Sequence, residues 1–201
     1  VYTRSGTTWS QQAYIKASNM DASDKFGYSM SIDGDTLAVS ATGEASNQNT
    51  ITNGSTSSDD NSAEYSGAVY IYTRSGTSWS QQAYIKPSNA VANGGFGSSV
   101  SLKGDILVVG AQGEDSNATT ITNGSSASSD TSVETSGAVY VFKRSGTNWS
   151  QIAYIKAANG DVEDGFGGSR IALDNSTIVV GANQEDSNQR GITNGNTASS
   201  N

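Results

Sequence analysis

Clusters of acidic and amide side chains recur in the polar stretches of this sequence, and their types could bind a cation. The segments GEASN, GEDSN and QEDSN start at positions 43, 113 and 184. Calcium takes about six to eight oxygen ligands, mostly from carboxylates and carbonyls. The candidate metal ligands are therefore the following side chains: Glu114, Asp115, Asn117, Glu185, Asp186 and Asn188.

A solvated acidic loop with Asx-turns is the favoured alternative for these segments. Their spacing is not that of a diagnostic calcium loop, and the first copy carries Ala45 where the others have aspartate. Acids also precede the FG dipeptides of the first and third copies, as at Asp24 and Asp164, whereas the second copy reads AVANGG there and has none. Structural turns are again favoured, so we expect no cofactor, with calcium as the open alternative.

Composition excludes several other chemistries. The chain has no histidine and no cysteine, which removes the commonest acid–base side chain, thiol nucleophiles and disulfides. Carboxylates are plentiful enough for a two-acid hydrolase, yet nothing singles out one pair. The net charge of -8 argues against nucleic acid as a partner, and no apolar run is long enough to predict a membrane span.

The elements that position these loops repeat along the chain. SGAVYIYTRSGTSWSQQAYIKPSN begins at Ser66, and SGAVYVFKRSGTNWSQIAYIKAAN begins at Ser136. The chain itself opens on VYTRSGTTWSQQAYIKASN. Trp9, Trp79 and Trp149 give a spacing of 70 residues, which suits a unit of four strands better than one solenoid coil.

Each period contains four predicted strands and no sustained helical periodicity. In the best-defined copies they span 98–102, 106–111, 68–74 and 79–86. The second to fourth carry apolar side chains on both faces, as strands of stacked sheets do. Four-stranded units stacked around an axis form a β-propeller, and the small residues of the first strand suit its innermost place. We expect an all-β fold, with Trp9, Trp79 and Trp149 as structural side chains.

Long polar loops follow the second strands, at 42–65, 112–135 and 183–201. Each contains ITNG, at 51–54, 121–124 and 192–195. Asn-Gly favours a type I′ turn, so we expect these loops to be partly ordered. The aliphatic residues Ile51, Ile121 and Ile192 are predicted to pin them onto the blades.

The FG-containing segments resemble those of a known family. FGYSMSIDGDTLAVSA, FGSSVSLKGDILVVGA and FGGSRIALDNSTIVVGA are similar to FG-GAP repeats, the units of integrin-α-type β-propellers, here of the bacterial extracellular type. The resemblance implies seven blades, an extracellular or cell-surface location, and adhesion or ligand binding through loops on one face. It also implies a calcium loop patterned D-x-D-x-D-G, but the turns DGDT, KGDI and DNST depart from that pattern, so that site is not carried over.

We therefore interpret the chain as one repeat array with β-propeller blades of four antiparallel strands. Residues 1–25 are expected to form a half blade, 26–95 and 96–165 two blades, and 166–201 a second half blade. The expected partners are copies of itself or further repeats that complete the split blade, together with a surface protein or glycan ligand. The expected function is a non-enzymatic, extracellular structural or adhesive module; the alternatives are a carbohydrate-binding propeller and a polysaccharide hydrolase.

Overall fold

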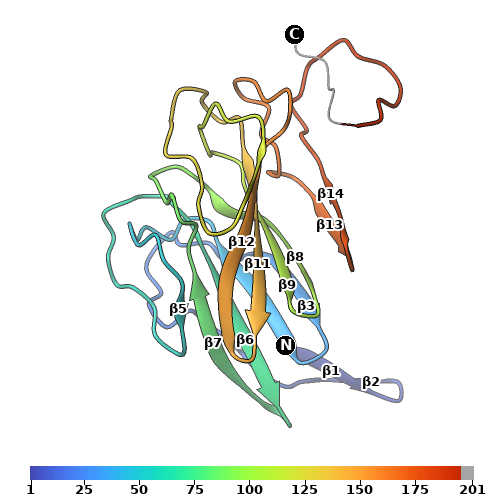
Figure 1. The fold of residues 1–201 in the computed structure, drawn as a ribbon. Helices are drawn as coiled ribbons and strands as arrows, with labels where there is room; N and C mark the ends of the chain where they lie inside the picture. The colour runs from blue at the N-terminus through green and yellow to red at the C-terminus, as the bar shows by residue number, and fades with distance from the viewer. Residues whose placement is uncertain (196–201) are drawn as a thin grey trace.

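The protein is built from β-strands alone in the residues that the structure, a computed structural model, describes, which are 1–195 (Figure 1). The strands are β1 (Tyr2–Ser5), β2 (Thr8–Gln11), β3 (Phe26–Asp33), β4 (Thr36–Ala41), β5 (Thr52–Asn53), β6 (Ala68–Ser75), β7 (Ser78–Ile85), β8 (Phe96–Lys103), β9 (Ile106–Ala111), β10 (Ile121–Asn123), β11 (Ala138–Ser145), β12 (Asn148–Ile155), β13 (Ile171–Asp174) and β14 (Thr177–Val180). The expected all-β class is confirmed.

Two complete blades occupy the middle of the chain. Their strand orders are β3-β4-β6-β7-β5 and β8-β9-β11-β12-β10, with every neighbouring pair antiparallel. The four long strands of each blade have the same order in the sheet as in the chain. Two tight turns and one long loop connect them. The predicted spans differ from these strands by no more than two residues at either end.

The first two ITNG segments form a fifth, short edge strand in the two complete blades, which the sequence interpretation missed. β5 pairs with β7, and β10 pairs with β12. The type I′ prediction is wrong: in the two complete blades only the glycines of these segments have a positive φ, 120° at Gly54 and 103° at Gly124. The prediction that these isoleucines attach the loops to the blades is confirmed for Ile51, which packs against the core. It is wrong for Ile121 and Ile192, which are exposed. Backbone pairing therefore orders the loops.

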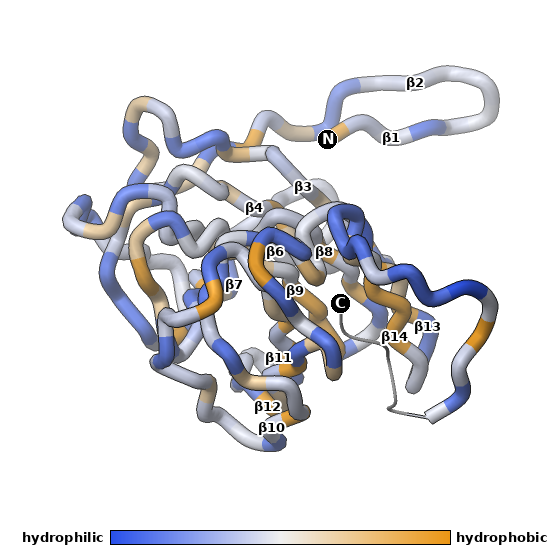
Figure 2. The backbone as a smooth tube through the Cα atoms, turned by 90° about the horizontal axis from the view of Figure 1, so that it is seen from above, coloured by the Kyte–Doolittle hydropathy of each residue, from blue (hydrophilic) through white to orange (hydrophobic). Residues whose placement is uncertain are grey.

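Two-stranded sheets flank the complete blades. β1 pairs with β2, and β13 pairs with β14. Figure 2 shows the β1–β2 hairpin projecting away from the rest of the molecule. Among the described strands, no backbone ladder joins β1–β2 to β13–β14.

The blades stack with their first strands side by side. β3 lies against β8, and β8 lies against β13, as the innermost position of the first strand predicts. The Leu102 amide donates to Ser31 Oγ at 3.0 Å, and Ser99 Oγ donates to the Gly167 carbonyl at 2.6 Å. The main core cluster lies between the two complete blades, where residues such as Ile71 and Phe96 are fully buried.

Glycine permits the closest approach between blades. A Cβ on Gly67 would lie 2.0 Å from the Phe96 carbonyl oxygen, and Gly67 has a φ of +80°. Gly137 makes the same approach to Phe166, with its hypothetical Cβ 2.3 Å from the Phe166 nitrogen. The position before each A-V-Y strand must therefore be glycine, because the next blade leaves no room for a side chain there.

Candidate functional site

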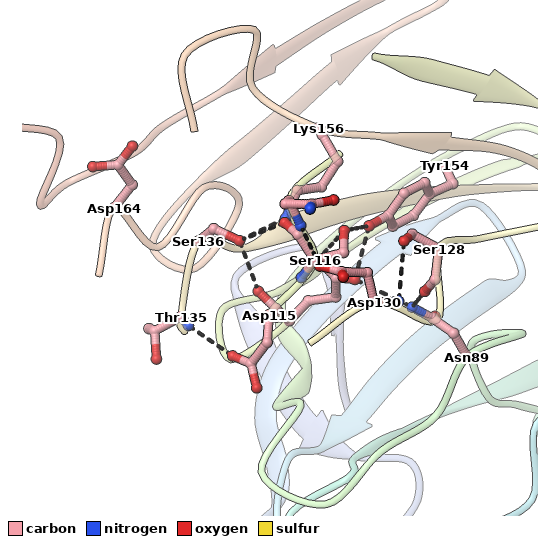
Figure 3. Close-up of polar contacts among 12 residues, drawn as sticks. Asn89, Asp115, Ser116, Ser128, Asp130, Thr135, Ser136, Tyr154, Lys156 and Asp164 are labelled. Atoms are coloured by element: carbon pink, nitrogen blue, oxygen red, sulfur yellow. Dashed lines mark hydrogen bonds and ion pairs between the residues drawn. The ribbon is translucent and has the colours of Figure 1, made fainter. Parts of the chain in front are cut away.

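In the two complete blades, a buried ion pair lies where the long loop leaves the blade. In the second blade, Lys156 Nζ lies 2.7 Å from Glu114 Oε2, and both side chains are almost completely buried. Figure 3 shows Lys156 among Ser116, Ser136 and Tyr154. Lys156 follows β12 directly, whereas Glu114 begins the loop after β9. The pair therefore ties the start of the loop to the outermost long strand.

Further donors surround the Glu114 carboxylate. Tyr154 Oη donates to Oε1 at 2.7 Å, and Asn89 Nδ2 donates to the same oxygen at 3.2 Å. Lys156 Nζ also donates to Ser136 Oγ at 2.7 Å, and that hydroxyl donates to the Glu114 carbonyl. These contacts use the lone pairs of the carboxylate, as a buried charge requires.

The first blade repeats the arrangement with its own residues. Lys86 Nζ lies 2.9 Å from Glu44 Oε2, and Tyr84 Oη donates to Glu44 Oε1 at 2.7 Å. Asn19 and Ser66 take the places of Asn89 and Ser136. The repeat thus extends from backbone pairing to individual polar contacts.

Burial controls the titration of these groups. Desolvation lowers the pKa of Lys156 and of Lys86, while the neighbouring glutamate opposes the shift. Burial also raises the pKa of Tyr154 and Tyr84 well above its ordinary value. Both tyrosines therefore remain hydroxyl donors at neutral pH.

The interior of each long loop is organised by one aspartate. Asp60 Oδ2 accepts the Asn47 amide at 2.8 Å and the Ser62 hydroxyl at 2.9 Å. Asp130 accepts the Asn117 amide at 3.0 Å in the second blade. The Asn47 amide lowers the pKa of Asp60 most, whereas the Ser132 hydroxyl lowers that of Asp130 most.

The structure places the first three candidate metal ligands in separate roles. Glu114 belongs to the buried ion pair, while Asp115 Oδ1 accepts the Thr135 amide at 2.7 Å. Asn117 contributes its backbone amide to Asp130. These residues order the loop through contacts with protein donors.

The other three candidates follow β14 and lie on the surface. Glu185 Oε1 accepts Asn159 Nδ2 at 3.0 Å, while Asp186 and Asn188 are exposed. Within residues 1–195, no group of three or more acidic, histidine or cysteine side chains is arranged to hold a metal ion. The structure therefore does not bring the six candidates into one site.

The acids before the FG dipeptides make turns. Asp24 and Asp164 are buried, and each accepts the backbone amide three residues earlier, at 2.8 Å. Burial raises the pKa of both carboxyls. A surface cavity of about 380 Å³ lies beside Asp24, with Asp21, Asn61 and Glu64 in its lining.

Sequence reasoning missed the lysine, tyrosine, asparagine and serine partners of the buried glutamates. A signal was present: AYIK occurs in all three copies, and each of these lysines lies 42 residues after a glutamate in the complete blades. A lysine that follows a strand with two apolar faces has to be paired if it is buried. That argument would have placed Glu114 in an ion pair.

The repeated tryptophans differ in exposure. Trp149 is buried and donates from Nε1 to Gln82 Oε1 at 3.0 Å, which joins the outer strands of the two blades. Trp79 makes the same bond to Gln12 at 2.9 Å and is half-buried. Trp9 is exposed. The stabilising contact of each tryptophan depends on the preceding blade.

Comparison with known proteins gives one match. The family model described as FG-GAP repeat matches residues 9–72, 79–127 and 149–196, which together make up more than half of the chain. No curated protein matches the chain. The described residues contain no helix that is long and apolar enough to cross a membrane.

Proposed function

Because this chain belongs to the FG-GAP repeat family, we propose that it is a non-enzymatic adhesive module of an extracellular or cell-surface protein. Its blades are those of an integrin-type β-propeller. The observation that carries the proposal is the buried Glu–Lys–Tyr network, because it holds the long polar loop of both complete blades in the same conformation.

The loops lie together at one end of the blades. In each blade the long loop connects the second and third long strands, so it leaves at the end opposite to the β6–β7 and β11–β12 turns (Figure 1). The loops offer hydroxyl, amide and carboxylate groups on a rigid support. Such a surface suits recognition of a glycan or of a polar protein surface, because little ordering entropy is lost on binding.

The non-enzymatic part of the proposal rests on the hydrogen-bond partners and the pKa shifts of the carboxylates. Glu44 and Glu114 are saturated by lysine, tyrosine and asparagine donors. Asp60 and Asp130 bind loop donors, which lower their pKa and keep them ionised. A general acid needs instead a raised pKa and access to the substrate. Asp24 and Asp164 have raised pKa values, but both are buried and each accepts a backbone amide of its own turn.

A binding screen with matched variants tests the proposal. The folded chain is applied to arrays of polysaccharides and surface proteins. Asp59→Lys and Ser129→Lys alter exposed positions in the two long loops, and Thr77→Lys and Thr147→Lys alter exposed turns at the other end. We expect the loop variants to lose binding and the turn variants to keep it.

Two results would contradict the proposal. One is binding of the chain to an array ligand that the turn variants abolish and the loop variants leave intact. The other is release of reducing sugar from a bound polysaccharide, which would make the chain a hydrolase. If the chain binds only to glycans on the arrays and the loop variants lose that binding, the result would support adhesion in its carbohydrate-binding form.

A further inference from the structure

The β1–β2 hairpin and the segment that follows it expose aromatic side chains that the complete blades bury. Tyr14 is 80% exposed and Trp9 is 65% exposed. The corresponding side chains of the second blade, Tyr154 and Trp149, are 0% and 2% exposed. The hairpin therefore has the side chains of an outer blade pair without the inner strands that would cover them.

The β13–β14 sheet has the two inner strands of a blade without paired outer strands. A cavity of about 510 Å³ lies beside it, with Asn159, Phe166, Val180 and Glu185 in its lining. In the second blade, Phe96, the counterpart of Phe166, contacts Tyr140 with ring centroids 5.5 Å apart. The cavity thus corresponds to the space that the outer strands fill in a complete blade.

The polar groups of the two partial sheets match. Glu185 accepts Asn159 Nδ2 as Glu114 accepts Asn89 Nδ2. Within residues 1–195 neither Glu185 nor Lys16 has an ion-pair partner. Since Lys16 corresponds to Lys156 in the repeat, the partial sheets hold the two halves of one ion pair.

Apolar faces match as well. Tyr28, Met30 and Ile32 form an exposed stripe along β3, with exposures of 60%, 61% and 56%. The equivalent face of β8 is buried, because the first blade covers it. Val179 on β14 is 63% exposed, whereas its counterpart Val108 is fully buried. A β13–β14 sheet placed against β3 would cover both surfaces.

We propose that a second copy of this chain extends the β13–β14 sheet: its β1–β2 hairpin adds to β14, and its Tyr14 and Lys16 occupy the cavity beside Glu185. In the same contact, β13–β14 covers the apolar stripe on β3 of the incoming copy. The occupant is thus defined by an aromatic side chain, an ammonium group and a free strand edge that fit the cavity together.

The complete blades supply the register of this contact. Thr36 on β4 lies opposite Thr73 on β6. By the repeat, Thr177 corresponds to Thr36 and Thr3 to Thr73, so Thr177 lies opposite Thr3 of the second copy. Among the described strands of one copy, no backbone ladder joins β1–β2 to β13–β14, so we assign the contact to two copies. A head-to-tail contact of this kind closes into a ring, or extends into a filament if the rotation does not close.

Disulfide trapping tests the register. The chain has no cysteine, so Thr3→Cys/Thr177→Cys introduces only the designed pair. Directly opposed residues of antiparallel strands fall within disulfide reach. The control, Ser5→Cys/Thr177→Cys, displaces one partner by two residues to about 7–8 Å. We expect covalent dimers or longer chains from the first variant alone under mild oxidation; monomers only, or equal trapping of both variants, would overturn the proposal.

Sedimentation tests the ion pair. The unmodified chain is expected to associate with increasing concentration, and Lys16→Met or Glu185→Gln to weaken association more than about tenfold. Lys143→Met removes an exposed lysine from the middle of the array and serves as the matched control. A monomer at every concentration, or equal association of the Lys16 and Lys143 variants, would contradict docking of a second copy.

Discussion

At the scale of the residue, a few buried polar side chains determine how this protein presents its loops. Glu114 and Lys156 are both buried, so each needs the other. Removing one partner of a buried ion pair leaves an uncompensated charge, whereas replacing both by apolar groups is often tolerated. The repeat supplies natural controls, because the same residue types occur in a partial blade without the partner.

Glu114→Gln tests this dependence. The substitution leaves the Lys156 ammonium buried without a carboxylate and should lower the free energy of unfolding by about 3–5 kcal/mol. Glu185→Gln, at the exposed equivalent position, should change it by less than about 0.5 kcal/mol. Adding Lys156→Met to Glu114→Gln should restore much of the loss. Urea denaturation measures all three variants, and equal effects of Glu114→Gln and Glu185→Gln would contradict the role of the pair.

The tryptophans provide a graded series. Trp149→Ala removes a buried ring and should cost about 3–5 kcal/mol of unfolding free energy. Trp79→Ala should cost less because Trp79 is half-buried, and Trp9→Ala should be nearly neutral in the isolated chain because Trp9 is exposed. Thermal melts in dilute solution give this order. Loss of ligand binding without loss of stability would make the tryptophans a binding surface.

Acid should loosen the loops through Asp60 and Asp130. Their pKa values are lowered in the fold by the Asn47 amide and the Ser132 hydroxyl, respectively. A lowered pKa contributes stability above the ordinary aspartate value of 3.8, and that contribution is lost as the pH falls through the folded value. Asp24 and Asp164 have raised pKa values and act in the opposite direction.

Stability measured between about pH 5 and pH 2 should therefore fall less steeply in Asp60→Asn/Asp130→Asn than in the unmodified chain. Denaturant titrations at each pH provide the comparison. Parallel curves for the two proteins would show that neither carboxylate stabilises its loop.

At the scale of the element, alternating apolar residues and tight turns were enough to predict the long strands. Strand β9 was predicted over its full length, because ILVVGA is a continuous apolar run between two polar segments. The fifth strand could not be predicted in this way. β10 is three residues long, and its Ile121 is exposed, so no hydrophobic pattern marks it. Its stability comes from backbone bonds to β12, which sequence periodicity does not report.

The buried glutamates show the same limit at the candidate site. GEDSN looks like a solvated acidic loop when only neighbouring residues are considered. Lys156 lies far along the chain from Glu114, so burial of that carboxylate depends on a long-range contact. The acidic positions were recognisable from the sequence, but their partners required the fold.

Close contact between blades makes Gly67→Ala a test of their stacking. A Cβ there would meet the Phe96 carbonyl at 2.0 Å, whereas a Cβ on Gly76 would meet nothing within 4 Å. Both glycines have a positive φ, so each alanine costs about 1–2 kcal/mol. Gly67→Ala should cost a further amount of about 1–3 kcal/mol from overpacking. Chemical denaturation measures the difference, and equal losses would contradict the stacking.

At the scale of the whole molecule, stability comes from stacked blades and paired loops. The ion pairs and hydrogen bonds at the loop bases are made between protein groups. The turns between the first and second strands are too short to supply about six oxygen ligands by themselves. Calcium is therefore not expected to support the fold.

Chelation tests that expectation directly. The melting temperature should be unchanged after treatment with EGTA and after addition of excess calcium. A magnesium titration controls for ionic strength. A drop of many degrees that calcium restores and magnesium does not would identify a structural calcium site.

Hydrogen–deuterium exchange tests the central claim, that buried networks hold the polar loops of the complete blades rigid. Gly137 donates its amide to the Glu114 carbonyl, and Asn117 donates its amide to Asp130. We predict that these amides, with their counterparts Gly67 and Asn47, exchange far more slowly than unstructured peptide. In solution dilute enough to keep copies apart, residues 183–195 should exchange faster, because Glu185 has no lysine partner within the described chain. Rapid exchange throughout 42–65 and 112–135 would contradict the account.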